Sequence, residues 1–264
     1  MDRASMSRDA LQRLRTVVVR TVSTAYAIFT GRNTPWHRGL TDELAFWDRW
    51  LCDAGTPGFR FRTDPESMLQ PWIECRLDAG RSVHRILDVG SGPLSVIGRK
   101  SSVGAIEVTC CDPLAHGYIA LLARHQVLNQ HSIVAVAAET LSSHFPDGHF
   151  DIAFSNNAID HSQDPIKVLR EMALVTRVGG VIIIQVAVNE GARGSYTGLH
   201  QWDCAMEGGR FTIAARNSEP VDVASEVSHL LDPVIIESVT VSPAGLTWDR
   251  PHIRAVFLRR NAQL

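Results

Sequence analysis

The segment that most constrains the fold of this chain is residues 85–94, RILDVGSGPL. Its first half is an apolar run of strand length, and its second half is a turn built on Gly90 and Gly92. A buried strand that runs directly into a glycine turn is typical of the first unit of an open α/β sheet, where backbone approaches a ligand. A second apolar run ends about twenty residues later at Asp112. Together these segments predict a nucleotide-type ligand at the carboxyl ends of two parallel strands.

Strand and helix patterns alternate from about residue 83 onward, which predicts a doubly wound parallel α/β sheet. Residues 181–184 are continuously apolar, as expected when helices cover both faces of a sheet. We expect seven strands, with the last one antiparallel. The expected strands are residues 85–89, 106–111, 133–137, 150–155 and 181–188, then an antiparallel pair at 234–241 and 252–258 joined by a Pro/Gly loop at 243–251, and the expected helices are residues 94–101, 117–130 and 165–177.

Residues 1–80 precede this alternation and have a helical but irregular pattern. Residues 41–54 place apolar side chains at helical spacing, which predicts an amphipathic helix. Asp64 followed by Pro65 is a helix-start signal, with Asp as the N-cap and Pro at the first helical position. We therefore expect an N-terminal helical extension or lid over residues 1–80 and a ligand-binding domain over residues 81–264.

Residues 189–233 interrupt the alternation after the fifth expected strand. Residues 204–215 form two short apolar runs around Gly208 and Gly209, which predicts a hairpin. Residues 221–231 have a helical pattern. In an α/β sheet an insertion at this point faces the ligand, so we expect it to lie on the substrate side.

The composition is that of a globular protein without a strong bias in charge. Of the 264 residues, 45% are hydrophobic and the net charge is −2, so nothing favours nucleic acid as a partner. No apolar run reaches the roughly 18 residues needed to span a bilayer. Five arginines in the first twenty residues predict a basic amphipathic helix, with an Arg-rich transit peptide as the alternative. Five cysteines without a CxxC spacing predict a reduced, cytoplasmic chain without a zinc site.

The segment DVGSG at residues 88–92 resembles the first motif of the class I S-adenosylmethionine (SAM)-dependent methyltransferases, in particular their small-molecule, type 11-like branch. The likeness extends from about residue 83 to residue 188. It implies a Rossmann-like sheet and SAM as the cofactor. The further segments that match the family in order are 138–141 (AETL), 145–153 (FPDGHFDIA), 160–165 (DHSQDP), 169–172 (LREM) and 177–180 (RVGG).

The resemblance also implies which residues meet the cofactor. The glycine turn would hold the methionine end of SAM, Asp88 would face its ammonium group, and Asp112 would bind the ribose hydroxyls. Many relatives hold the adenine with an Asp at the position of Ala137, so here Glu139 or backbone must supply that contact. The expected cofactor-binding residues are Asp88, Gly90, Ser91, Gly92, Asp112, Pro113, Ala138, Glu139 and Asn156.

Methyl transfer to a hydroxyl needs a group that takes the proton, and histidine is the natural candidate near neutral pH. His161 follows the fourth expected strand, and His200 lies in a polar and aromatic part of the insertion, so we expect either or both to be catalytic. The alternative for His161 is a bond to backbone. Asp160 is a candidate to orient His161, although neighbours on a loop often diverge. The residues expected to contact the acceptor are Trp36, His37, Tyr196, Trp202 and Asp203, with core packing as the alternative for Trp202.

A catalytic metal is the less favoured alternative. Asp151, Asn156, Asn157 and Asp160 are residue types that bind Mg²⁺. However, Asp151 stands at the start of its expected strand, far from the edge where ligands bind. We therefore expect no metal site.

These observations predict SAM-dependent O-methylation of a small-molecule or glycosyl acceptor. The alternatives are N- or C-methylation of a secondary metabolite, and a SAM-binding protein without turnover. An NAD-dependent dehydrogenase is disfavoured because Ser95 stands where the dinucleotide fingerprint has its third glycine. Beyond the acceptor we expect no nucleic acid or membrane span, with a homodimer as an open alternative.

Overall fold

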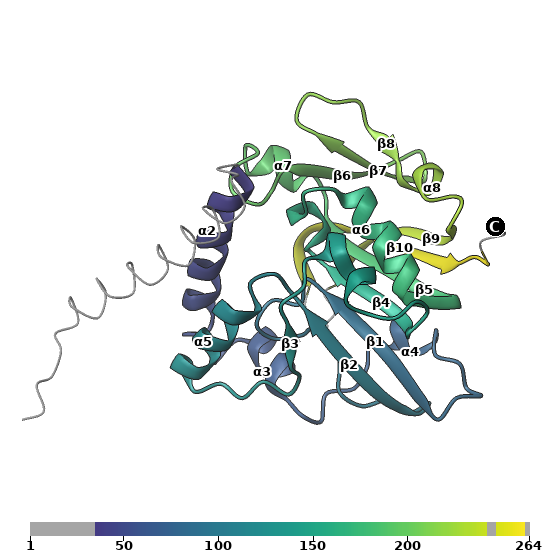
Figure 1. The fold of residues 1–264 in the computed structure, drawn as a ribbon. Coiled ribbons are helices and arrows are strands. Elements are labelled where there is room, and N and C mark those ends of the chain that lie inside the picture. The colour runs from purple at the N-terminus through teal and green to yellow at the C-terminus, as the bar shows by residue number, and fades with distance from the viewer. Residues whose placement is uncertain (1–34, 242–246, 262–264) are drawn as a thin grey trace, which may run out of the picture.

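The structure, a computed structural model, describes residues 35–241 and 247–261 (Figure 1). The Arg-rich segment in the first twenty residues therefore lies outside the described residues, as does the first part of the expected loop at 243–251. Among the helices of the described residues, none is both long and apolar enough to cross a membrane.

A seven-stranded sheet forms the centre of the molecule, in the order β3-β2-β1-β4-β5-β10-β9. The pairs from β3 to β5 are parallel, whereas β10 is antiparallel to both β5 and β9. This topology confirms the expected fold class, including the antiparallel last strand. The strands are β1 (Val83–Val89), β2 (Ala105–Cys111), β3 (Ile133–Val134), β4 (Phe150–Asn156), β5 (Thr176–Ala187), β9 (Leu231–Val241) and β10 (Thr247–Arg259).

The central strands are buried on both faces, which explains their continuous apolar sequence. On one face lies helix α6 (Pro165–Val175), which begins where Asp164 accepts a hydrogen bond from the Lys167 N–H at 2.9 Å. Helix α5 (Ala115–His125) ends five residues before the expected bound, because Gln126 adopts a left-handed conformation that terminates the helix.

The expected helix at residues 94–101 is wrong: the chain there is an irregular loop. Side chains satisfy the loop's carbonyl groups in place of helical hydrogen bonds, since Gln70 donates to the Val96 oxygen at 2.6 Å and Arg62 donates to the Leu94 oxygen. At Gly98 the loop passes so close to Met68 that a Cβ atom would stand 2.0 Å from its carbonyl oxygen. Tertiary contacts therefore override the helical pattern.

The helix-start signal at Asp64 is also wrong. The helix in this region is α3 (Pro57–Thr63), whose N-cap is Thr56, and Asp64 is its C-cap. A proline follows both Thr56 and Asp64, but only the first of these signals opens a helix. A short helix, α4 (Pro71–Glu74), follows.

Helix α2 (Pro35–Trp50) begins six residues before the expected helix and ends four residues before its expected end. It lies beside α5, at the edge of the sheet shown on the left in Figure 1. The close contact depends on Gly117 of α5, where a Cβ atom would stand 2.7 Å from the Leu44 side chain. The division into residues 1–80 and 81–264 stays a prediction.

The insertion after β5 forms a second, three-stranded sheet that lies over α6 (Figure 1). Its hairpin confirms the expected one, with Gly208 and Gly209 at positive φ in the turn. The expected helix at residues 221–231 is wrong, since only one helical turn forms there. The elements of this region are α7 (Glu190–Arg193), β6 (Trp202–Glu207), β7 (Arg210–Ala215), β8 (Val221–Asp222) and α8 (Val223–Glu226).

Candidate functional site

A cavity of about 420 Å³ opens at the carboxyl ends of β1, β2 and β4, and side chains of α2 form its opposite wall. Its volume is in the range of small-molecule sites. It lies at the point where the strand order reverses between β1 and β4, which is where open α/β sheets bind their ligands.

The glycine turn after β1 forms one side of this cavity. Gly90 and Gly92 have φ angles of 70° and 63°, a conformation that favours glycine. A Cβ atom at Gly90 would stand 2.4 Å from the Ala158 side chain, and one at Gly92 would stand 2.8 Å from the Trp47 ring. The glycines therefore let both the turn and α2 come close to the same space, as the sequence motif predicted.

Asp88 is buried at the end of β1 and lines the cavity. Ser95 donates a hydrogen bond to its carboxylate at 2.6 Å. Burial raises the pKa of Asp88 to about 6, although the Ser95 hydroxyl and the Arg62 charge oppose this shift. A carboxylate in this setting favours a cationic ligand group.

Asp112 is buried at the end of β2 and accepts hydrogen bonds from the N–H groups of Gly92 at 3.2 Å and Leu114 at 2.9 Å. Burial raises its pKa to about 7, and the nearby Glu43 carboxylate adds to the shift, while the two N–H groups oppose it. Glu43 also lines the cavity and accepts a hydrogen bond from the Trp47 indole at 2.7 Å. The sequence motif does not include Glu43, because α2 approaches this edge only in the folded protein.

Arg62 of α3 is a second cavity residue that the sequence motifs miss. Its guanidinium lies over the rings of Trp47 and Trp50, 5.5 and 5.6 Å from their centroids. Burial lowers its pKa to about 10, while the Asp88 charge opposes the shift. Arg62 thus places a cation among the carboxylates of the cavity.

The segment expected to meet adenine is a short 3₁₀ helix, η1 (Ala138–Ser143), and its first two residues line the cavity. The Glu139 carboxylate accepts a hydrogen bond from the Gln163 N–H at 2.7 Å, so one of its oxygens is already engaged. Pro113 and Asn156, the remaining expected cofactor residues, also line the cavity. All nine expected cofactor residues are therefore brought to one cavity.

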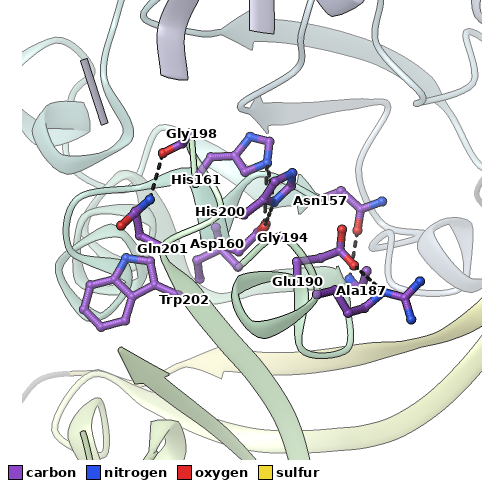
Figure 2. A network of polar contacts seen from close by, with 12 residues as sticks. Asn157, Asp160, His161, Ala187, Glu190, Gly194, Gly198, His200, Gln201 and Trp202 are labelled. Atoms are coloured by element: carbon purple, nitrogen blue, oxygen red, sulfur yellow. Dashed lines mark hydrogen bonds and ion pairs between the residues drawn. The ribbon is translucent and has the colours of Figure 1, made fainter. Parts of the chain in front are cut away.

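Asp160, His161 and His200 form a polar cluster on the same cavity, named here the Asp-His-His cluster (Figure 2). The first two residues belong to a 3₁₀ helix after β4, η2 (Ile159–His161), and His200 comes from the insertion. Asp160 Oδ2 is 2.8 Å from His200 Nδ1 and 3.6 Å from His161 Nε2, and the two ring nitrogens are 3.2 Å apart. Sequence analysis paired Asp160 with His161, whereas the structure gives it the closer contact with His200.

Asp160 and His200 each stabilise the charged form of the other. The hydrogen bond that His200 donates to the Asp160 carboxylate raises the pKa of His200, against the effect of its burial. Burial alone would raise the pKa of Asp160, but the neighbouring His161 and His200 outweigh it and lower that pKa. Asp160 is thus held as a carboxylate although its side chain is only 2% exposed.

Of the residues expected to contact the acceptor, Trp36 lines the cavity, and its indole N–H donates to the His161 carbonyl oxygen. The other four are not among the described residues that line it. His37 is buried behind Trp36 with its ring edge-on at 5.2 Å. The contact of His37 with the acceptor stays a prediction.

The remaining three, Tyr196, Trp202 and Asp203, make contacts outside the cavity. The Tyr196 hydroxyl donates to Asp203, which also accepts from the Ala192 N–H at 2.8 Å. The Trp202 indole donates to the Ser162 carbonyl oxygen at 2.9 Å, and its ring packs against the main core. These contacts hold side chains of the insertion that carries His200, and their contact with the acceptor stays a prediction.

Two residues that were not expected from the sequence, Glu190 and Arg250, line the cavity wall. Two contacts of 3.0 Å join the Arg250 guanidinium to the two carboxylate oxygens of Glu190. Glu190 follows β5 directly and Arg250 belongs to β10. The position of Glu190 just after a parallel strand is the signal that could have identified it from sequence.

Of the four residues of the magnesium alternative, Asn156, Asn157 and Asp160 line the cavity, whereas Asp151 does not. Asp151 lies at the amino end of β4, where its carboxylate is 2.7 Å from Arg177 and 3.3 Å from Arg81. It accepts a further hydrogen bond from the Arg85 N–H at 2.8 Å. These contacts engage the Asp151 carboxylate at the amino end of β4, whereas Asn156 and Asp160 lie at and beyond its carboxyl end.

Residues 87–184, from β1 to β5, match the family model described as a methyltransferase domain. This segment is therefore similar to methyltransferase domains. This match agrees with the resemblance to SAM-dependent methyltransferases that the sequence motifs indicate. No curated protein sequence matches the chain.

Several solved methyltransferase structures resemble the fold at low sequence identity. One is the N-methyltransferase NodS of Bradyrhizobium japonicum in complex with S-adenosylhomocysteine, at 15% identity and a TM-score of 0.48, over 86% of this chain and 100% of that one. Another is a possible histamine N-methyltransferase of Thermotoga maritima, at 14% identity and a TM-score of 0.49 over the same shares. A third is the 1,6-didemethyltoxoflavin-N1-methyltransferase of Burkholderia thailandensis, at 14% identity and a TM-score of 0.41, over 99% and 94%.

Proposed function

We propose that this protein transfers a methyl group from SAM to a hydroxyl group of a small-molecule or glycosyl acceptor. The observation that carries the proposal is one cavity that joins the glycine turn and Asp112 to the Asp-His-His cluster. The parallel strands that carry these groups lie in the order β2-β1-β4, so the cofactor residues and the cluster lie side by side along one edge. A donor and an acceptor bound along this edge would lie next to each other.

The residues of the cofactor end suit SAM. Asp88 is a buried carboxylate that would face the ammonium group, and Asp112 has oxygen lone pairs for the ribose hydroxyls. Gly90 and Gly92 allow close approach of the methionine end to the backbone. When bound, SAM supplies the methyl group and a thioether leaving group.

At the acceptor end, the hydroxyl oxygen would form the bond to the methyl carbon while the carbon–sulfur bond breaks and its electrons stay on sulfur. The hydroxyl proton would leave toward the Asp-His-His cluster. Alignment of the two reactants supplies most of the rate enhancement. We assign His200 and His161 to assist the loss of the proton, and Asp160 to position them.

The substitution His200→Ala tests the acceptor end. We expect turnover to fall by about 10²-fold or more, the usual contribution of an assisting group, while SAM affinity stays unchanged. The measurements are release of S-adenosylhomocysteine with a panel of hydroxylated acceptors and calorimetry with SAM. The matched control is His229→Ala, which removes an exposed histidine of the same domain.

A set of acceptors that present an amine in place of the hydroxyl distinguishes the alternatives within the class. Methylation of the amines alone would contradict O-methylation. Binding of SAM without product from any acceptor would support a SAM-binding protein without turnover. Calorimetric binding of NAD instead of SAM would overturn the proposal as a whole.

A further inference from the structure

We propose that Asp160, His161 and His200 bind a divalent transition-metal ion. Three potential ligand atoms converge in the Asp-His-His cluster, one from each side chain. They come from two segments about 40 residues apart in the sequence, which the fold brings together at the cavity wall. The site is distinct from the magnesium set considered from sequence, of which only Asp160 is a member.

The geometry of the three atoms fits an ion. Asp160 Oδ2, His161 Nε2 and His200 Nδ1 form a triangle with sides of 2.8, 3.2 and 3.6 Å. The point equidistant from the corners of such a triangle lies about 1.9 Å from each atom, slightly less than the usual metal–ligand distances of about 2.0–2.2 Å. An ion at those distances would sit just outside the plane, with its remaining coordination positions free.

Hydrogen bonding within the cluster leaves donors and acceptors unmatched. A neutral imidazole carries one proton, and the single proton of His200 Nδ1 faces both Asp160 Oδ2 and His161 Nε2. The second oxygen, Asp160 Oδ1, is buried and has no hydrogen-bond partner. A cation would satisfy the converging lone pairs together, and Asp160 could contribute either oxygen to it.

The type of ligand selects the metal. Two imidazoles and one carboxylate are typical ligands of iron, cobalt, zinc and related ions, whereas Mg²⁺ and Ca²⁺ prefer oxygen. The side chains of His161 and His200 are 20% and 39% exposed, so the free positions of the ion would face the cavity. There an acceptor hydroxyl could bind and lose its proton more readily. This role in catalysis rests on the proposed function, whereas metal binding itself does not.

Titration of the chelator-treated full chain with Co²⁺ tests the site, with the visible absorption of bound Co²⁺ as the readout. We expect one ion per chain and displacement of Co²⁺ by Zn²⁺ but not by Mg²⁺. Each of Asp160→Asn, His161→Ala and His200→Ala should weaken Co²⁺ binding by at least about tenfold, as expected when a metal ligand is lost. His229→Ala should leave it unchanged.

Absence of Co²⁺ binding to the native chain would overturn the inference, as would equal binding by all variants. Asp160→Asn keeps the shape of the side chain, so it serves if a histidine variant fails to fold. SAM affinity separates the two proposals: a chain that binds SAM and methylates without metal retains the proposed function and lacks the ion. A chain that binds Co²⁺ at these residues but no SAM retains the ion and lacks the proposed function.

Discussion

Asp112 is a carboxylate that two backbone N–H groups hold in place at the end of a buried strand. Those two bonds fix its orientation, and the oxygen lone pairs that remain are available to a ligand. Glu43 of α2 is a second carboxylate that lines the same cavity and lies close enough to raise the pKa of Asp112. The role of Asp112 can therefore be separated from that of its neighbour by single substitutions.

The substitution Asp112→Ala should weaken SAM binding by about 1–3 kcal/mol per lost charge-assisted hydrogen bond, because the ribose hydroxyls lose their acceptor. Calorimetry with SAM measures the change. Glu207→Ala, on the hairpin of the insertion, is the control. Unchanged affinity in Asp112→Ala would contradict the ribose assignment.

At the residue scale the sequence predicted one half of the site better than the other. The cofactor residues lie in four short segments at or after the parallel strands, so their position is set by local sequence and by the strand order. The acceptor side depends on long-range packing, which brings His200 within hydrogen-bond distance of Asp160 and engages Tyr196 and Trp202 in other hydrogen bonds. Local pattern carries no information on such contacts.

At the element scale, the loop that follows the glycine turn is the feature that departs most from the sequence pattern. Residues 94–101 have apolar residues at helical spacing, yet side chains of other segments occupy their carbonyl groups. The strands β1, β2, β4 and β5 and helix α6, by contrast, carry long apolar runs or a strong N-cap and form near their predicted positions, whereas the strand expected at 133–137 forms only over Ile133–Val134. Element type was predictable where local and tertiary preferences agree.

Substitutions at Gly98 and Gly208 distinguish the cost of a steric clash from the cost of an unfavourable backbone conformation. Gly98→Ala should lower the free energy of unfolding by about 2–3 kcal/mol or more, because its Cβ would collide with the Met68 backbone. Gly208→Ala should cost only about 1 kcal/mol, because its positive φ disfavours alanine while nothing lies within 4 Å. Urea unfolding measures both values, and equal costs would contradict the close packing of the loop.

At the scale of the whole molecule, two buried carboxylates make stability depend on pH. The pKa values of Asp88 and Asp112 are raised to about 6 and about 7, above the unfolded-state value of about 3.9. The native state therefore binds more protons than the unfolded state between about pH 4 and pH 7, and the contribution of these groups to stability falls as pH rises through that range.

The substitution Asp112→Asn removes one of these ionisations. The variant should gain stability relative to the native chain between pH 5 and pH 8, by roughly 2 kcal/mol, because the native chain alone must ionise a buried group. Urea unfolding at both pH values measures the difference in the free energy of unfolding between the variant and the native chain. The variant also loses the hydrogen bond from Gly92, but this loss is the same at each pH and therefore does not affect the change with pH. A constant difference would show that Asp112 is ionised throughout.

The placement of β10 between β5 and β9 has a consequence for synthesis on the ribosome. Strand β9 pairs only with β10 among the described residues, although it precedes β10 in the chain. Until residues 247–259 have emerged, one edge of β5 is unpaired and apolar, and β9 has no partner strand to pair with. Nascent chains stalled before residue 247 should therefore be held by chaperones or aggregate, and the sheet closes only once residue 259 has emerged.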